Sequence, residues 1–161
     1  MKKMTRRGVA VVGLDPDKDK TGIAVIKDGV ITLSNGSFVD VLRVIRELQQ
    51  QGPLEVYLEA AWLTKSNWHL NHIQSIFAAS KIGYNIGENH TVGRLLFECF
   101  NAMGVNVQAI RPLAKYWKGR DAKISHAELE AQLAACGVSG LAKRSNPEQR
   151  DAAVIALWYS L

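Results

Sequence analysis

The first apolar run of this chain is Gly8-Val9-Ala10-Val11-Val12-Gly13-Leu14, and Asp15 follows it directly. Such a run is typical of a buried strand with a polar residue at its end. Two further short strands are predicted at Gly22–Lys27 and Gly29–Leu33. The sequence Lys27-Asp28-Gly29 between them predicts a β-hairpin, because Asp and Gly adopt the positive φ angles of tight turns. The chain is therefore expected to begin with three antiparallel strands.

The rest of the chain alternates between helical and strand patterns. Leu54–Leu58 is a continuous apolar strand, typical of a buried parallel pairing, and Val105–Ile110 alternates as a further strand. Helical patterns cover Phe38 to Leu48, Trp68–Ala79, about Thr91–Met103, Ser125–Cys136, and the segment from Pro147 onward, with Asn146 as its cap. This order predicts one α/β domain over residues 1–161. Its mixed five-stranded sheet is antiparallel in the first three strands and then parallel, with helices on both faces.

Composition and charge limit the classes of function. With 161 residues, 47% hydrophobic and 22% charged, the chain can build one domain with a substantial core. Its 20 Lys and Arg against 15 Asp and Glu give a net charge of +5, which favours a polyanionic partner. Cys99 and Cys136 lie in apolar helical patterns and are expected to be buried, reduced thiols. No bilayer-spanning run and no cleavable signal are recognised, so a cytoplasmic protein without membrane contact is expected.

Four carboxylates stand at the ends of apolar segments. Asp15 and Glu59 follow strands, whereas Glu148 and Asp151 begin the last helix and share one face at i,i+3 spacing. Each alone is explained as a turn residue, a solvated strand end, or an acid favoured by the helix dipole. As a set they fall at the carboxyl ends of the strands of a parallel sheet, which is the side on which such sheets usually bind ligands. Hard oxygen donors beside a basic surface predict a Mg²⁺ site that acts on a phosphodiester.

Several short motifs, taken in order, resemble the RuvC-type Holliday junction resolvases of the RNase H-like superfamily. Gly13-Leu14-Asp15-Pro16 with Thr21-Gly22-Ile23-Ala24 resembles the first hairpin and first catalytic acid of that family. Leu58-Glu59 resembles its second acid, and Glu148-x-x-Asp151-Ala152-Ala153 its C-terminal acidic helix. The resemblance spans about Gly8 to Leu157. The chain departs from the family at Glu148, where the family usually has Asp or His.

The resemblance implies an RNase H-like fold and a nuclease that uses two Mg²⁺ ions, with Mn²⁺ as a substitute. Asp15 would bridge both ions, and Glu59, Glu148 and Asp151 would complete their shells. One ion would activate water and the other would stabilise the leaving 3′ oxygen. Lys115 and Lys123 fall where the family has basic residues near the scissile phosphate. We expect Lys123 to stabilise charge on the phosphorane. The alternative interpretation of Lys123 is a solvated lysine near the start of a helix.

Other side chains are candidates for contacts with DNA. Trp62 could stack on an unpaired base or wedge into a base step, or it could fold onto the domain edge. Basic residues could line a phosphate track, although solvation is their commoner explanation. The candidates are Lys65, Arg94, Arg111, Lys115, Lys118, Arg120 and Lys123, with Lys143 and Arg144 before the acidic helix. In Lys115-Tyr116-Trp117-Lys118-Gly119-Arg120, basic and aromatic residues alternate, as they often do on nucleic-acid surfaces.

The resemblance further implies a substrate and an assembly. The substrate would be branched DNA, a four-way junction resolved by paired symmetric nicks in DNA recombination and repair or in phage DNA processing. Paired cuts call for a homodimer, and Trp68–Ala79 and Thr91–Met103 are apolar enough to supply its interface or simply to be core. A related nuclease for RNA–DNA hybrids or other branched DNA, and a non-catalytic junction-binding protein, stay open. Actin-like ATPases need two large lobes, for which 161 residues are too few.

Overall fold

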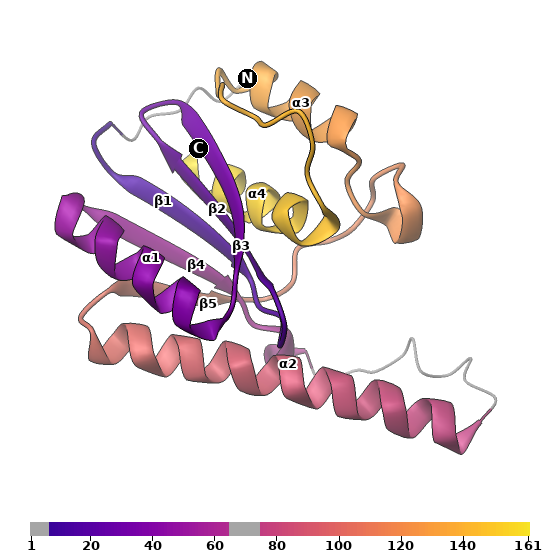
Figure 1. The fold of residues 1–161 in the computed structure, drawn as a ribbon. Coiled ribbons are helices and arrows are strands. Elements are labelled where there is room, and N and C mark those ends of the chain that lie inside the picture. Colours follow the sequence, from indigo (N-terminus) through magenta and orange to yellow (C-terminus); the bar gives the residue numbers. More distant parts are fainter. Residues whose placement is uncertain (1–6, 65–74) are drawn as a thin grey trace.

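The computed structural model describes residues 7–64 and 75–161, which form one five-stranded sheet with helices on both faces (Figure 1). The strands are β1 (Ala10–Asp15), β2 (Thr21–Lys27), β3 (Val30–Gly36), β4 (Leu54–Glu59) and β5 (Asn106–Ile110). Their spatial order is β3-β2-β1-β4-β5. The first three pair antiparallel, whereas β4 pairs parallel with both β1 and β5. The predicted mixed sheet is confirmed.

The hairpin between β2 and β3 has the predicted turn. Lys27 pairs with Val30, so Asp28 and Gly29 form a two-residue loop. Their φ angles are 49° and 81°. Positive φ at both loop positions matches the right-handed twist of the two strands, and Asp-Gly is among the sequences that tolerate it best.

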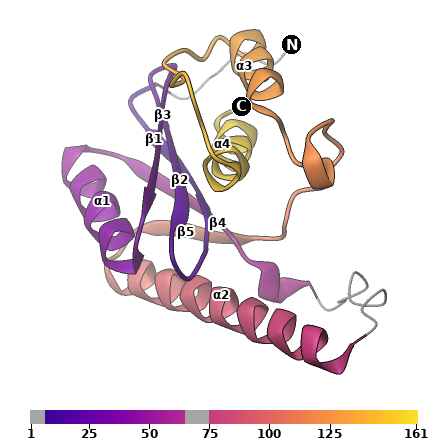
Figure 2. The same cartoon turned by 45° about the vertical axis from the view of Figure 1, so that its right-hand side comes forward.

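The helices divide between the two faces of the sheet (Figure 2). Helices α1 (Phe38–Gln51) and α2 (Ile76–Ala102) cover one face, and α3 (His126–Ala135) and α4 (Pro147–Ser160) cover the other. Successive side chains of a strand point to opposite faces. In β2, Ile23 therefore joins the core under α1 and α2, whereas Ala24 and Ile26 join the core under α3 and α4.

Helix α4 packs directly on the backbone of β1 and β2 through two glycines. A Cβ at Gly13 would overlap the carbonyl oxygen of Ala152, and a Cβ at Gly22 would overlap that of Glu148. Gly22 is also the partner of Asp15 in the β1–β2 register. The absence of side chains at these two positions thus places the first turns of α4 beside the end of β1.

The caps of α3 and α4 are as predicted, but α2 is not. Ser125 and Asn146 each form a capping box at the start of their helices. Instead of two helices at Trp68–Ala79 and Thr91–Met103, one helix of 27 residues runs from Ile76 to Ala102. The stretch between the two predicted helices contains Gly83, Asn85 and Gly87, which are poor helix formers. Packing at the other end of the helix, where Leu96 and Phe100 are buried, outweighs that local preference. Residues 68–74 lie outside the described part of the chain.

Two short 3₁₀ turns, η1 (Ala61–Leu63) and η3 (Arg120–Ala122), complete the described elements. Cys99 and Cys136 are free thiols, but both are half-buried, so the prediction that they are buried is wrong. Among the described helices, none is long and apolar enough to cross a membrane.

Candidate active site

Three carboxylates from three elements meet at the carboxyl edge of the sheet. Strands β1 and β4 are parallel neighbours in which Leu14 pairs with Leu58. The next residue of each strand is acidic, so Asp15 and Glu59 stand side by side where the two strands end. Helix α4 brings the third carboxylate, Asp151, which interacts electrostatically with both. The predicted convergence of strand-end acids with an acid of the last helix is thus present.

Burial and mutual repulsion make Asp15 hard to ionise. Its pKa is raised from 3.8 to about 8, first by burial, then by the charge of Glu59 and that of Asp151. Lys115 and Lys123 act in the opposite direction but do not offset the rise. Burial also raises the pKa of Glu59. Fully ionised, the cluster would carry more negative charge than its protein surroundings neutralise, so a bound cation would favour the charged form of these carboxylates.

Two lysines supply the positive charge at this site. The Nζ atoms of Lys115 and Lys123 lie 3.2 Å and 3.3 Å from Oδ2 of Asp151, whose side chain is only 11% exposed. Burial alone would lower the pKa of Lys115, but Asp151 and Glu59 attract its charge, and the net result is a raised pKa. Both lysines come from the loop between β5 and α3. Sequence reasoning assigned them to phosphate contacts; their direct pairing with a carboxylate was not expected.

The residues at this edge fit a divalent metal ion by their chemistry. Three carboxylates offer the hard oxygen donors that Mg²⁺ prefers, and their charge is incompletely neutralised. Within residues 7–64 and 75–161, however, no three His, Cys, Asp or Glu side chains are already arranged as a metal-binding group. In the described structure, Asp151 is instead paired with the two lysines.

A small cavity adjoins the cluster. Glu59, Lys115 and Asp151 form its polar side, while Leu113, Trp117, Val154 and Ile155 supply apolar walls. Apolar walls lower the local dielectric constant, so the charges in this cavity interact more strongly than they would in water. Trp117 was not singled out as a site residue from the sequence. The only signal for it was the alternation of basic and aromatic residues at 115–120.

Glu148 lies beside the cluster rather than within the cavity that Glu59 and Asp151 line. It borders an open groove together with Arg120, Lys123 and His126. Its backbone carbonyl packs against Gly22, so the start of α4 is fixed on the sheet at this point. Lys123 lines this groove together with Glu148 and is also paired with Asp151.

Trp62 rests on α2. It lies in η1, three residues after Glu59, and is half-buried. A Cβ at Gly93 would lie 2.5 Å from Cζ3 of the indole ring, so this glycine makes room for Trp62. The guanidinium carbon of Arg94 lies 5.9 Å from the ring centroid, within the range of a cation–π contact. The packing on α2 agrees with the expectation of a tryptophan at the domain edge, while part of the ring remains accessible.

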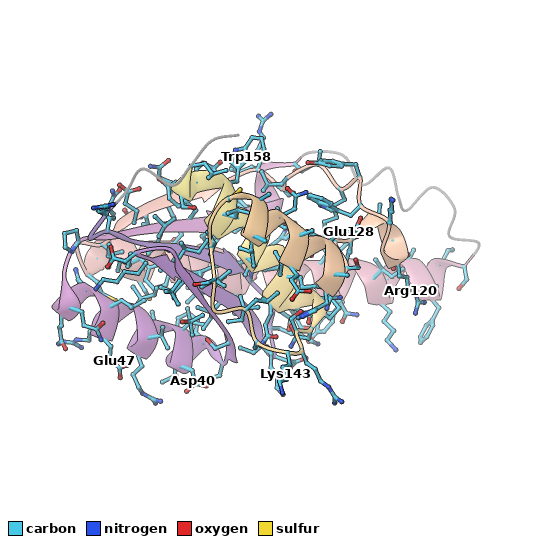
Figure 3. The ribbon with its side chains drawn as sticks, turned by 90° about the horizontal axis from the view of Figure 1, so that it is seen from above. Asp40, Glu47, Arg120, Glu128, Lys143 and Trp158 are labelled. Carbon is cyan, nitrogen blue, oxygen red and sulfur yellow. The ribbon has the colours of Figure 1, made fainter. Side chains whose placement is uncertain are left out.

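The other predicted DNA contacts lie on exposed loops. Arg111 directly follows Ile110, the β5 residue paired with Glu59, so it stands near the cluster edge. Lys118 is exposed, and its backbone N–H donates to Oε1 of Glu128. Arg120 lies at the protein surface (Figure 3), 3.8 Å from Asp121. Lys143 and Arg144 are exposed on the loop before α4. Lys65 lies outside the described residues.

Two sets of contacts that support the site were missed from the sequence. The loop between β1 and β2 is attached to α2: Lys18 pairs with Glu88 at 2.6 Å, and its backbone N–H donates to Asn89 at 2.9 Å. The second set centres on Arg150, which donates to the carbonyl oxygens of Ile124 and Ser145. Arg150 thereby connects the segments that precede α3 and α4. Polar contacts between segments distant in sequence leave no pattern in the local sequence.

Comparison with known proteins identifies the fold. No protein-family model matches this chain, and no curated protein matches it either. The structure of T. thermophilus RuvC in complex with a Holliday junction substrate is similar, with a TM-score of 0.51 at 16% sequence identity, covering 92% of this chain and 90% of that chain. A second Thermus thermophilus RuvC structure gives a TM-score of 0.51 at 18% identity, covering 92% and 91%. The chain has the RuvC-type, RNase H-like fold over nearly its whole length.

Proposed function

We propose that this chain is a divalent-metal-dependent endodeoxyribonuclease that resolves four-way DNA junctions by paired nicks. The observation that carries the proposal is the carboxylate cluster of Asp15, Glu59 and Asp151, at which the pKa of Asp15 is raised to about 8. Its place at the carboxyl edge of the sheet is the usual ligand side of this class of fold. The fold likeness to a protein whose structure holds a Holliday junction substrate supports the choice of substrate.

Asp15, Glu59 and Asp151 would hold the metal, and Glu148 would add a ligand from the neighbouring groove. Mg²⁺ is the expected ion, with two ions bound and Mn²⁺ as a substitute. When bound, Mg²⁺ would lower the pKa of a water molecule and neutralise charge on the phosphate. The protein contributes a fixed arrangement: Asp15 and Glu59 are set by the β1–β4 register, and Asp151 by the packing of α4 on Gly13 and Gly22.

Lys115 and Lys123 are assigned to the phosphate next to the cut. Both ammonium groups already lie at the cluster, within 3.3 Å of Asp151. Once a metal ion neutralises the carboxylates, these lysines are available for the phosphate and for the charge that develops on it during cleavage. Trp62, Arg94, Arg111 and Lys118, with Lys65 outside the described residues, would bind the flanking DNA.

We further propose a homodimer assembled through α2. The N-terminal part of this helix projects beyond the sheet (Figure 1). It carries large apolar side chains in water: Ile76 is 88% exposed and Phe77 is 82% exposed, and Tyr84 is exposed as well. Such a group of exposed apolar residues marks an interaction surface. A second copy is the fitting occupant, because a four-way junction has two-fold symmetry and needs two nicks.

The proposal is tested with purified protein and a labelled synthetic four-way junction, in Mg²⁺ or in EDTA, beside duplex and RNA–DNA hybrid controls. Symmetric nicks in the junction that require Mg²⁺ are expected. They should disappear in Asp15→Asn, while the matched change at the exposed Asp19, Asp19→Asn, should cut normally. Cleavage of the hybrid alone would assign the protein to another RNase H-like activity. Junction binding without cutting in Mg²⁺ or Mn²⁺ would indicate a non-catalytic junction-binding protein.

A further inference from the structure

An apolar pocket lies on the outer side of α3 and α4. Its volume is about 150 Å³, and its inner wall includes Leu129 and Leu157. Two aromatic side chains at its rim are largely in water: Tyr116 is 69% exposed and Trp158 is 62% exposed. Figure 3 shows Trp158 at the outer surface of the molecule. Large aromatic residues are costly to leave in water, and two of them at one pocket indicate a binding surface.

This pocket and the carboxylate cavity share two residues. Trp117 and Val154 line both, so the two hollows lie on either side of the same wall. Trp117 lies in the loop that also supplies Lys115 and Lys123 to Asp151, whereas Val154 belongs to α4. A chain molecule bound at the carboxylates could therefore reach the apolar pocket.

We propose that this pocket binds one unpaired nucleobase of the DNA strand that is cut at the carboxylate cluster. The inference rests on the proposed nuclease function and goes beyond it by naming a second contact site for the substrate. A nucleobase has flat apolar faces and polar edges. Tyr116 and Trp117 are already stacked, with ring centroids 4.7 Å apart, and offer a platform for such a face. The exposed Gln132 at the rim carries an amide suited to a base edge.

Size and charge agree with this occupant. A dry apolar cavity of about 150 Å³ accommodates a ring of the size of benzene. The loop from Arg111 to Lys123 carries five Lys or Arg residues and one acid, Asp121, so its surroundings suit a polyanionic backbone. An apolar peptide anchor would use the pocket but would gain nothing from that charge. At a branch point, bases are available without the full cost of opening a duplex.

The test asks whether removal of one base and removal of a pocket side chain affect DNA binding in a coupled way. Wild-type protein and Trp158→Ala are bound in Ca²⁺ to a synthetic four-way junction, and a single abasic site is moved in turn through the nucleotides around the mapped cleavage site. For the wild type, one position should weaken binding about tenfold, which corresponds to ~1.4 kcal/mol and lies within the range for base–aromatic stacking. In Trp158→Ala, and likewise in Tyr116→Ala, that penalty should vanish, because the pocket no longer grips the base.

Controls distinguish the base-pocket proposal from the nuclease function on which it rests. Val39→Ala truncates a side chain on α1 that is exposed to a similar degree, and it should retain the full abasic penalty. If the wild type binds and cuts the junction but no abasic position couples to Trp158 or Tyr116, the base pocket is wrong and the nuclease stands. If those variants bind DNA normally yet lose a protein ligand, the pocket is a protein-docking site. If no junction is bound at all, both proposals fall together.

Discussion

Helices α4 and α2 lie on opposite faces of the same sheet and are held in different ways. Helix α4 lies on bare strand backbone at Gly13 and Gly22 and buries most of its apolar side chains. Helix α2 is nearly twice as long, buries only Gly93, Leu96 and Phe100, and exposes large apolar residues at its start. The helix that carries a proposed metal-binding carboxylate is thus fixed in place, whereas the helix proposed for assembly leaves apolar surface for a partner.

The largest expected effect is on catalysis through α4. Asp151→Asn should lower the junction-cleavage rate by about 10³-fold or more, because it removes a hard metal donor and the shared partner of Lys115 and Lys123. Single-turnover cleavage in Mg²⁺ measures the change. Glu98→Gln on α2, an exposed carboxylate far from the cluster, is the matched control. Wild-type cleavage by Asp151→Asn would remove this residue from the site.

The next effect is on stability through the contact between α4 and β1. Gly13→Ala should lower the free energy of unfolding by about 3 kcal/mol or more, since its Cβ would overlap the carbonyl oxygen of Ala152 and rigid backbone cannot yield cheaply. Urea unfolding followed by circular dichroism measures this loss. A variant as stable as the wild type would mean that α4 can slide on the sheet, and the contrast with α2 would disappear.

A third prediction concerns pH. The pKa of Asp15 is raised in the folded state to about 8, so the folded state favours the protonated form. The stabilisation that this provides is complete below the unfolded-state pKa and is lost as pH rises toward 8. Metal-free wild type should therefore become less stable between pH 5 and pH 8, whereas Asp15→Asn should not follow this trend. At pH 8 the variant should be more stable by about 2 kcal/mol.

Thermal unfolding in EDTA across that pH range provides the measurement. Burial is also the main cause of the raised pKa of Glu59. The stability of Asp15→Asn is therefore expected to fall with rising pH as well, but less steeply than that of the wild type. Parallel curves for wild type and variant would show that Asp15 titrates normally and that the carboxylates are not crowded.

A smaller effect is expected from the exposed start of α2. Phe77→Asp should raise the dissociation constant of the proposed dimer at least about tenfold, or ~1.4 kcal/mol, because the side chain is 82% exposed in the monomer and apolar contact would be replaced by charge. Sedimentation over a range of concentrations measures it. The stability of the monomer should not change, which distinguishes this surface from the α4 contact. Identical sedimentation of wild type and variant would argue for another interface.

The smallest effect should have the opposite sign to that of Gly13→Ala. Gly83 lies within α2, and a Cβ there would meet no atom within 4 Å. Gly83→Ala should therefore raise the free energy of unfolding by about 0.5–1 kcal/mol through helix propensity alone. Urea unfolding again reports the change. A loss of stability would show that this stretch of α2 is already covered by a partner.

The same pair of helices shows what the sequence could predict. The strands, the Asp28-Gly29 turn, the capping box at Ser125 and the cap at Asn146 depend on neighbouring residues, and their patterns predicted them correctly. The convergence of Asp15 and Glu59 followed from the rule that parallel strands end together. The continuity of α2 could not be predicted, because burial of Leu96 and Phe100 and the attachment of Lys18 to Glu88 are long-range effects. For the same reason the lysine pairing of Asp151 left no local signal.

That pairing would make metal uptake at the proposed site an exchange of one cation for another. Lys115 and Lys123 hold Asp151 through Nζ–Oδ2 distances of 3.2 Å and 3.3 Å, so the chain carries its own counter-ions where a divalent ion would enter. An incoming ion gains only the difference between its own attraction to Asp151 and that of the ammonium groups it displaces. The affinity of the proposed site for a metal ion would be correspondingly weakened. Magnesium supply would then govern when the protein acts.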